Sequence, residues 1–467
     1  MLIVKPEWNI RIDPTNVLLY EQSPDGQITN AFAMHPFMAA LLCMFDGTRT
    51  TEEVCHNAAY VLDWQSKDAE KLVCEQLLRD YAAAFMECGS DHPSRPRPLP
   101  NPVEMLSSYN KVEFDPMGRL SAPHTVVWDI TWACPRRCIY CYAETNQAPS
   151  QAVLPLERAL SLVDEMAEAG VKTAYLGGGD PFAYPGIESV VRRMLDRSVI
   201  PQLATKSRLS KKTVAALASA GLHYFQVSLD SAEPEIVDFL TGSQGYLGDA
   251  ENNLRLLTEY GFNININAVI TPYNIQGVYE LIDMLAHYNV VRVSLSPYGR
   301  SHFRHRDDLF LSVKDQAILD QIIEMAKSKY PHIVFRSSGI VNLASMPPEK
   351  RRAIWERRAR CTAGRQSICI LPDGRVIPCE QTPTHEDVIL GDLKMQSLLD
   401  VWTSARAVEV ICPQRDKFAE QPCYNCTEFE ACRSVGSFCV RDAYTLFGTF
   451  YAPSPYCPKA EIKLRTM

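Results

Sequence analysis

Residues 124–144 read HTVVWDITWACPRRCIYCYAE, an apolar, strand-like run followed at once by three cysteines. Cys134, Cys138 and Cys141 have the spacing C-x-x-x-C-x-x-C. One short loop with this spacing can hold three corners of a [4Fe–4S] cube and leave the fourth iron without a protein ligand. Such an iron can bind and reduce a small molecule. We therefore predict that the chemistry of the chain begins here, with these cysteines as metal-binding and catalytic residues.

The segments around and after this loop alternate between strand-like and helix-like patterns. Strands are expected near 125–131, 172–176, 201–205, 223–229, 263–270 and 291–296, and helices near 155–169, 186–197, 209–220, 247–260, 275–288 and 312–329. Six β–α units in a row predict an α/β fold with a parallel sheet, curved into a full or partial barrel. In such barrels the chemistry lies at the C-terminal ends of the strands, which is where the three cysteines fall.

The size and composition of the chain restrict the classes of protein to which it could belong. Its 467 residues suggest two or three domains, and 46% hydrophobic with 22% charged residues describe a soluble globular protein. A formal charge of −8 argues against nucleic acid as the main partner. The apolar run 37–45 is far shorter than the ~20 residues that span a bilayer, and the N-terminus lacks a signal-peptide pattern. We expect a cytoplasmic protein with neither a membrane nor a nucleic-acid partner.

The chain contains sixteen cysteines. In a reducing cytosol, metal or cluster ligation explains them better than disulfides do. Three lie at 134–141 and nine between 361 and 457. The scattered cysteines, Cys43, Cys55, Cys74 and Cys88, are most simply core residues.

A glycine run follows the second expected strand in the segment YLGGGDPF, residues 175–182. Gly177, Gly178 and Gly179 let backbone groups approach a ligand closely, and Asp180 adds a carboxylate for an ammonium group. A glycine run alone usually marks a turn. At the strand end next to a cysteine loop, it indicates a ligand site.

Together these residues resemble the radical S-adenosylmethionine (SAM) superfamily. In that family the open iron binds the amino and carboxylate groups of SAM, and the reduced cluster cleaves SAM to a 5′-deoxyadenosyl radical that abstracts hydrogen. The segment GGGDP looks like the family's Gly-Gly-Glu motif, with Asp180 in place of the usual glutamate. The resemblance implies SAM contacts from Tyr140, Gly178, Gly179, Asp180, Thr205, Lys206, Ser228, Asp230 and Val269.

Two features leave alternatives open in this first group of residues. Related enzymes often carry an arginine about ten residues after the strand-four segment, where this chain has Thr241, so the SAM carboxylate must find another partner. Strand-end capping is the structural explanation for Ser228 or Asp230 taken singly. For the cysteine triad the alternative is a zinc site, although zinc prefers four ligands.

The C-terminal cysteines have a definite spacing. Cys361 and Cys369 precede Gly374, and Cys379 follows it. A C-x-x-C-x5-C run begins at Cys423 and is followed by gaps of six and seventeen residues to the next two cysteines of the pattern. This pattern looks like the SPASM extension, which carries auxiliary [4Fe–4S] clusters. The resemblance implies one cluster on Cys361, Cys369, Cys379 and Cys439, and a second on Cys423, Cys426, Cys432 and Cys457.

The gap before Cys439 is six residues where about three are usual, so Cys439 either still reaches its iron or leaves an open site for a substrate thiolate. Cys412 fits no position and is either an alternative ligand or a spare thiol. A zinc knuckle is the alternative for the run 423–432.

Residues 1–90 predict a small domain with strands at 9–13, 17–22 and 27–33 and helices at 35–45, 51–63 and 67–86. This order, with the turn FDGTRTTEEV, resembles the winged-helix-like recognition element of enzymes that modify ribosomally made peptides. The resemblance implies that a leader peptide adds a strand between 27–33 and 67–86. An accessory domain of another kind is the alternative. The Pro-rich stretch 91–102 begins a predicted linker.

The expected organisation is a recognition element (1–90), a linker (91–121), a radical SAM core forming a partial (β/α)6 barrel (122–340) and an irregular SPASM domain (341–467). This order looks like that of sactionine and related thioether synthases. We therefore expect a maturase that forms a thioether crosslink in a precursor peptide, served by an electron donor such as flavodoxin or ferredoxin. The alternatives are carbon–carbon crosslinking, epimerisation, formylglycine-type maturation, or a zinc-structured binding protein without catalysis.

Overall fold

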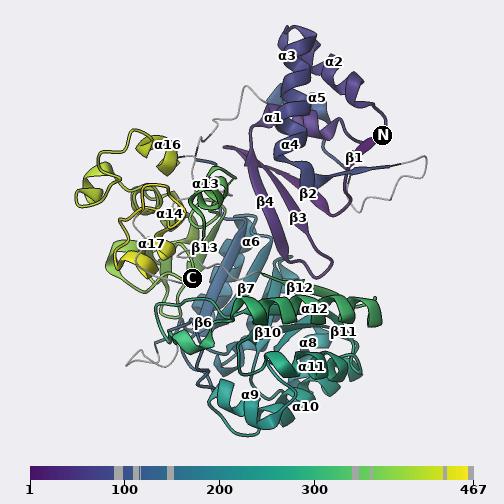
Figure 1. The fold of residues 1–467 in the computed structure, drawn as a ribbon, viewed down its shortest axis with the longest axis vertical. Helices are drawn as coiled ribbons and strands as arrows, with labels where there is room; N and C mark the ends of the chain where they lie inside the picture. The colour runs from purple at the N-terminus through teal and green to yellow at the C-terminus, as the bar shows by residue number, and fades with distance from the viewer. Residues whose placement is uncertain are drawn as a thin grey trace. The chain divides into compact units, whose positions relative to one another are not determined.

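The computed structural model describes residues 1–88, 98–108, 115, 117–144, 152–338, 346–357, 361–434 and 439–460. The chain divides into two compact units, Met1–Ser121 and Ala122–Met467 (Figure 1). The finer division into four parts stays a prediction.

The second unit contains all six predicted strands, as neighbours in chain order and all parallel. They are β6 (Thr125–Thr131), β7 (Thr173–Gly178), β8 (Ile200–Thr205), β9 (Tyr224–Ser228), β10 (Asn263–Ile270) and β11 (Val290–Pro297). A further parallel strand, β12 (Val334–Ser337), pairs with β11. The prediction of a parallel α/β sheet is confirmed.

The predicted helices of this unit are also present, packed against the sheet around a common apolar core (Figure 1). They are α6 (Leu156–Glu168), α7 (Ile187–Asp196), α8 (Lys211–Ser219), α10 (Tyr246–Glu259), α11 (Val278–Leu285) and α12 (Val313–Lys329). An additional short helix, α9 (Pro234–Thr241), lies between β9 and α10. Among the described helices, none has the length and apolar character needed to cross a membrane.

The C-terminal cysteine region begins as part of the barrel sheet. Strand β13 (Ser367–Ile370) pairs parallel with β6, and β14 (Arg375–Ile377) and β15 (Gly391–Asp392) continue the sheet in antiparallel pairs. Gly374 makes the turn between β13 and β14 with φ of 91°, a conformation that favours glycine. The described remainder is mostly loops and short helices: α13 (Pro348–Arg357), α14 (Leu398–Thr403), α15 (Ala405–Ile411), α16 (Phe429–Ser434) and α17 (Val440–Phe447), with 3-10 turns at Glu386–Val388 and Arg415–Phe418.

The first unit contains an antiparallel sheet with the order β2 (Trp8–Ile12), β3 (Val17–Gln22) and β4 (Ile28–Met34). Helices α1 (Pro36–Cys43) and α2 (Thr51–Leu62) follow close to their predicted positions. The predicted turn before α2 ends in a capping box, in which Thr50 and Glu53 satisfy each other's backbone amides.

The predicted helix 67–86 is wrong after Asp80. The segment consists of α3 (Ser66–Glu70), a π-helix η1 (Lys71–Leu77) and α4 (Leu78–Asp80), and then a 3-10 turn leads into β5 (Phe85–Glu87). Strand β5 pairs with β1 (Leu2–Val4), and Phe85 packs edge-on against Phe45 with ring centroids 5.1 Å apart. Long-range pairing and burial of Phe85 therefore override the helical preference of the alanines at 82–84.

Part of the predicted linker is folded onto the first unit. Helix α5 (Pro102–Ser108) packs against α1, where the sulfur of buried Met105 lies 3.5 Å from the Cys43 thiol. Residues 91–97 of the predicted linker lie outside the described part of the chain.

We predict that the hairpin carrying β14 stabilises the whole second unit. Val376→Ala removes two methyl groups from a site with 0% exposure, so the free energy of unfolding should fall by about 2 kcal/mol. The matched control Val334→Ala, on β12 and 52% exposed, should change it little. Urea unfolding of the anaerobically purified chain measures both, and equal, small effects would contradict the integrated sheet.

Candidate active site

The cysteine loop after β6 is fixed to the end of α9. The Arg137 amide donates to the carbonyl of Thr241 (2.9 Å) and the Ile139 amide to that of Leu240 (3.0 Å). Gly242 follows with φ of 60°, and a Cβ there would lie 2.6 Å from the Arg137 carbonyl oxygen. The segment FLTG, at the point where related enzymes often carry an arginine, therefore anchors the cysteine loop through its backbone.

Arg136, inside the cysteine loop, is a buried anchor that the sequence analysis missed. Its guanidinium donates to the Lys206 carbonyl (3.1 Å) and pairs with Asp249 (2.6 Å). It also lies 4.6 Å from the ring centre of Tyr246. Removing one partner of such a buried pair typically costs about 3–5 kcal/mol. The signal in the sequence was a basic residue between two cluster-type cysteines, and its partner 113 residues away could not be found by spacing.

The three thiols of the loop lie within electrostatic reach of one another. Burial raises the pKa of Cys138 to about 12; Lys206 opposes this shift, whereas charge on Asp230, Cys141 or Cys134 adds to it. Sulfur donors are the ligands that a [4Fe–4S] cluster takes, and binding would deprotonate them. The donor set and its clamped backbone therefore fit such a cluster.

The glycine segment at the end of β7 lies directly against the cysteine loop. The Gly179 amide donates to the Thr131 carbonyl (2.7 Å), and the Asp180 amide to that of Ala133 (2.9 Å). A Cβ on Gly179 would lie 2.0 Å from the Ala133 carbonyl oxygen. Gly178 has φ of 93°, and its Cβ would lie 2.7 Å from the Thr131 carbonyl oxygen. Side chains here would push the two loops apart.

Asp180 is buried, and donors from the chain itself engage its carboxylate. It accepts hydrogen bonds from the Thr205 hydroxyl (2.8 Å) and from the amides of Lys206 (2.7 Å), Ser207 (3.0 Å) and Phe182 (3.1 Å). The sequence predicts that this carboxylate meets an ammonium group. In the structure it holds the ends of β7 and β8 together, and its contact with SAM stays a prediction.

Asp230 gathers several of the predicted SAM contacts at the end of β9. Its carboxylate accepts hydrogen bonds from the Lys206 ammonium (3.1 Å), the Tyr140 hydroxyl and the Val269 amide (2.9 Å). Lys206 also donates to the Ser228 carbonyl (3.2 Å). Burial lowers the pKa of Lys206, but the charges of Asp230, Tyr246 and Cys138 and the hydrogen bond to Asp230 together outweigh burial, so the pKa of Lys206 is raised. The strand-capping role considered for Asp230 is real, since it ties β10 to this cluster.

The cysteines of the first C-terminal group lie near one another. Cys369 is fully buried on β13, and Cys439 forms the N-cap of α17. Burial raises the pKa of Cys439 to about 12, with smaller contributions from Asp442 and Cys361. Charge on Cys361 also raises the pKa of Cys379, and charge on Cys379 that of Cys369. The long gap before Cys439 thus does not carry it away from Cys361, although its role as a ligand stays a prediction.

The second group surrounds Cys423. Burial raises the pKa of Cys423; nearby Arg433 opposes the shift, and charge on Cys457, Cys432 or Cys426 adds to it. Arg433 donates to the Cys423 sulfur (3.3 Å) and Lys459 to that of Cys426 (3.2 Å). These cations suit the anionic thiolates of a cluster.

Cys412 is electrostatically coupled to Arg433, and so lies beside the second cysteine group. In the part of the chain that the structure describes, no three Cys, His, Asp or Glu side chains are placed to chelate one metal ion. A [4Fe–4S] cluster does not need such a site, because each of its cysteine thiolates binds a different iron atom.

Comparison with known proteins agrees with this geometry. Residues 128–298 match the radical SAM superfamily, and residues 361–427 match SPASM, an iron-sulfur cluster-binding domain. The fold and the two cysteine regions thus define a radical SAM enzyme with a SPASM domain, whose cofactors are SAM and [4Fe–4S] clusters.

Individual proteins are similar to this chain at low sequence identity. The PqqA peptide cyclase of Methylocella silvestris is 23% identical over 72% of this chain and 87% of its own length. The AdoMet-dependent heme synthase of Methanosarcina barkeri is 23% identical over 72% of this chain and 97% of its length. Streptococcus suis SuiB bound to S-adenosylmethionine has the same fold, with a TM-score of 0.61 and 18% identity over 99% of this chain and 100% of its own.

We predict that Gly179→Ala disables the site while Gly177→Ala does not. The Cβ on residue 179 would displace the backbone that carries Cys134, whereas on residue 177 its nearest neighbour is 3.5 Å away, an ordinary contact. We expect a loss of rate on the order of 100-fold, the factor that a misplacement of about 1 Å can cost. The measurements are 5′-deoxyadenosine formation and iron content, with circular dichroism as a check on folding. Equal rates for the two variants would contradict the close approach of the loops.

Proposed function

We propose that the chain is a radical SAM maturase that crosslinks a ribosomally made precursor peptide. The observation that carries this proposal is the convergence of the cysteine loop, the glycine segment and the Lys206–Asp230 pair at the C-terminal ends of parallel strands. The names of the relatives supply the substrate class: one group acts on the peptide PqqA, and SuiB is known bound to the precursor peptide SuiA.

The residue roles in this proposal follow from position. Cys134, Cys138 and Cys141 hold the cluster that, when bound, supplies the electron for SAM cleavage. Gly178 and Gly179 are assigned to the cofactor site because the absence of their side chains lets this segment lie directly against the cysteine loop. The remaining contacts are assigned to Tyr140, Asp180, Thr205, Lys206, Ser228, Asp230 and Val269.

Two auxiliary clusters belong to the same proposal. Cys361, Cys369, Cys379 and Cys439 are assigned to one, and Cys423, Cys426, Cys432 and Cys457 to the other. Residue 369 pairs with residue 127 of β6, so the first group lies one strand away from the strand that carries the cysteine loop. The sulfur of Cys369 lies 3.8 Å from the carboxylate of Asp129, a residue of β6. This placement suits an auxiliary cluster that accepts an electron or binds a substrate thiolate as the crosslink forms.

The first unit is proposed to bind the leader of the precursor. Strand β4 forms one edge of the β2–β3–β4 sheet, and an extended peptide can add to such an edge through main-chain hydrogen bonds. The likeness to SuiB spans 99% of the chain, whereas the peptide cyclase covers 72% of it. As the sequence resemblance implies, we assign the leader to a place between strand 27–33 and segment 67–86.

The crosslink itself is proposed to be a thioether between a cysteine sulfur and a carbon. A carbon–carbon bond is the second candidate, favoured by the relatives named peptide cyclases, because closing a ring in a peptide does not require a cysteine. Both products lack two hydrogen atoms of the substrate. They differ in whether a substrate thiol is consumed.

The test is reaction of the anaerobic, reduced enzyme with SAM and with each short peptide that is found to be encoded next to its gene. We expect a product lighter by two hydrogens, and loss of one alkylatable thiol identifies the thioether. Cys138→Ala should abolish SAM cleavage and product. Cys426→Ala should retain some cleavage and lose the product. Cys88→Ala, in the first unit, is the matched control and should retain both.

An unchanged peptide mass in the presence of active SAM cleavage would contradict the proposed substrate class. Equal product from Cys138→Ala and Cys426→Ala would contradict the separation of roles between the two cysteine regions.

A further inference from the structure

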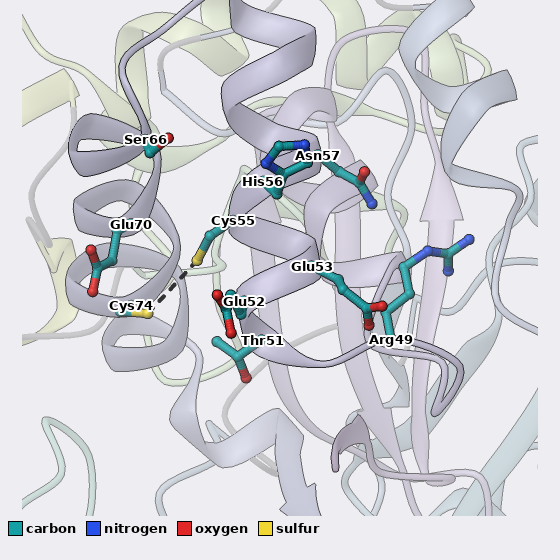
Figure 2. Close-up of a pocket in the computed structure, with 10 residues that line it drawn as sticks. All are labelled: Arg49, Thr51, Glu52, Glu53, Cys55, His56, Asn57, Ser66, Glu70 and Cys74. Atoms are coloured by element: carbon teal, nitrogen blue, oxygen red, sulfur yellow. Dashed lines mark hydrogen bonds between the residues drawn. The ribbon is translucent and has the colours of Figure 1, made fainter.

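The first unit has an open pocket of about 800 Å³ between α2 and the α3–η1 segment (Figure 2). Cys55 projects into it from α2 and Cys74 from η1, and Figure 2 shows the two sulfurs facing each other. None of the roles proposed above involves either thiol.

The two sulfurs are 4.0 Å apart. Cys55 is half-buried, and Cys74 is exposed to solvent. The expectation that these scattered cysteines are core residues is therefore wrong for Cys74. A disulfide has a sulfur–sulfur distance of about 2 Å, so side-chain rotation has to close a gap of about 2 Å.

Cys74 lies at the centre of the π-helix η1, Lys71–Leu77. π-helical turns are rare and are frequently found at functional sites. Val73 and Leu77 of the same segment are buried in the core of the unit. The wide turn thus keeps the apolar side of the segment packed while Cys74 stands in the pocket opposite Cys55.

We propose that Cys55 and Cys74 are a modification site, a dithiol that forms a reversible disulfide with a low-molecular-weight disulfide as oxidant. No third Cys, His, Asp or Glu among the described residues joins them to make a metal site. A disulfide would tie α2 to η1 across the pocket.

The exchange proceeds in two balanced steps. The exposed Cys74 thiolate attacks one sulfur of oxidised glutathione, which forms a mixed disulfide and releases one glutathione. Cys55 then attacks the Cys74 sulfur, which forms the internal disulfide and releases the second glutathione. Two electrons pass from the protein to the reagent, and the two thiol protons are left with the released glutathione. Cys74 reacts first because it is exposed to solvent, whereas Cys55 is half-buried and burial raises the pKa of its thiol to about 12.

The experiment titrates the anaerobically purified, cluster-loaded full chain with glutathione buffers, blocks free thiols and maps tryptic peptides without reduction. Trypsin separates residues 50–67, which hold Cys55, from residues 72–79, which hold Cys74. We expect these two peptides to become linked. At a constant ratio of reduced to oxidised glutathione, a tenfold dilution should raise the linked-to-unlinked ratio about tenfold, because an internal disulfide releases two glutathione molecules.

Cys55→Ser and Cys74→Ser should each abolish the link, and Cys88→Ser, in the same unit, should retain it. Glutathione carried on Cys74 without linkage at any dilution would overturn the proposal. A linked fraction that does not respond to dilution, or that forms only after the chain has lost its iron, would overturn it as well.

Discussion

The geometry of the candidate active site depends on how tightly the cysteine loop is held at the ends of the parallel strands. Two backbone hydrogen bonds join it to the end of α9, and the buried pair of Arg136 and Asp249 joins it to α10. On its other side the glycine segment lies so close that a single methyl group on Gly179 would collide with the loop. A site that binds both a cluster and a small cofactor needs this fixed geometry, because the open iron must lie where the cofactor is held.

The continuous sheet also connects the two cysteine regions of the second unit. Strand β13 pairs with β6, so Cys369 stands next to the strand from which the cysteine loop emerges. An auxiliary cluster at this place would be connected to the barrel through a continuous hydrogen-bonded sheet rather than through a flexible tether. The cations Arg433 and Lys459 mark the second group, where they meet the thiols of Cys423 and Cys426.

The sequence predicted the parallel sheet well because each strand can be recognised from a short local stretch that is followed by a helical pattern. Candidate site residues at the strand ends could also be selected from the sequence, because Gly179, Asp180 and Asp230 closely follow the predicted strands. The missed features depend on distant partners. Strand β5 forms because β1 is available, β13 joins β6 across more than 230 residues, and Arg136 finds Asp249. The role of the Asp180 carboxylate was likewise decided by neighbouring amides on another strand end, which spacing alone does not reveal.

The central claim is that Cys134, Cys138 and Cys141 hold a cluster whose open iron binds SAM. Electron–nuclear double resonance of the reduced protein with SAM labelled by ¹⁵N at its amino group tests this claim directly. We expect a ¹⁵N coupling to the reduced cluster, accompanied by a change in its electron paramagnetic resonance spectrum when SAM is added. A reduced cluster whose spectrum is indifferent to SAM and shows no ¹⁵N coupling would contradict the account.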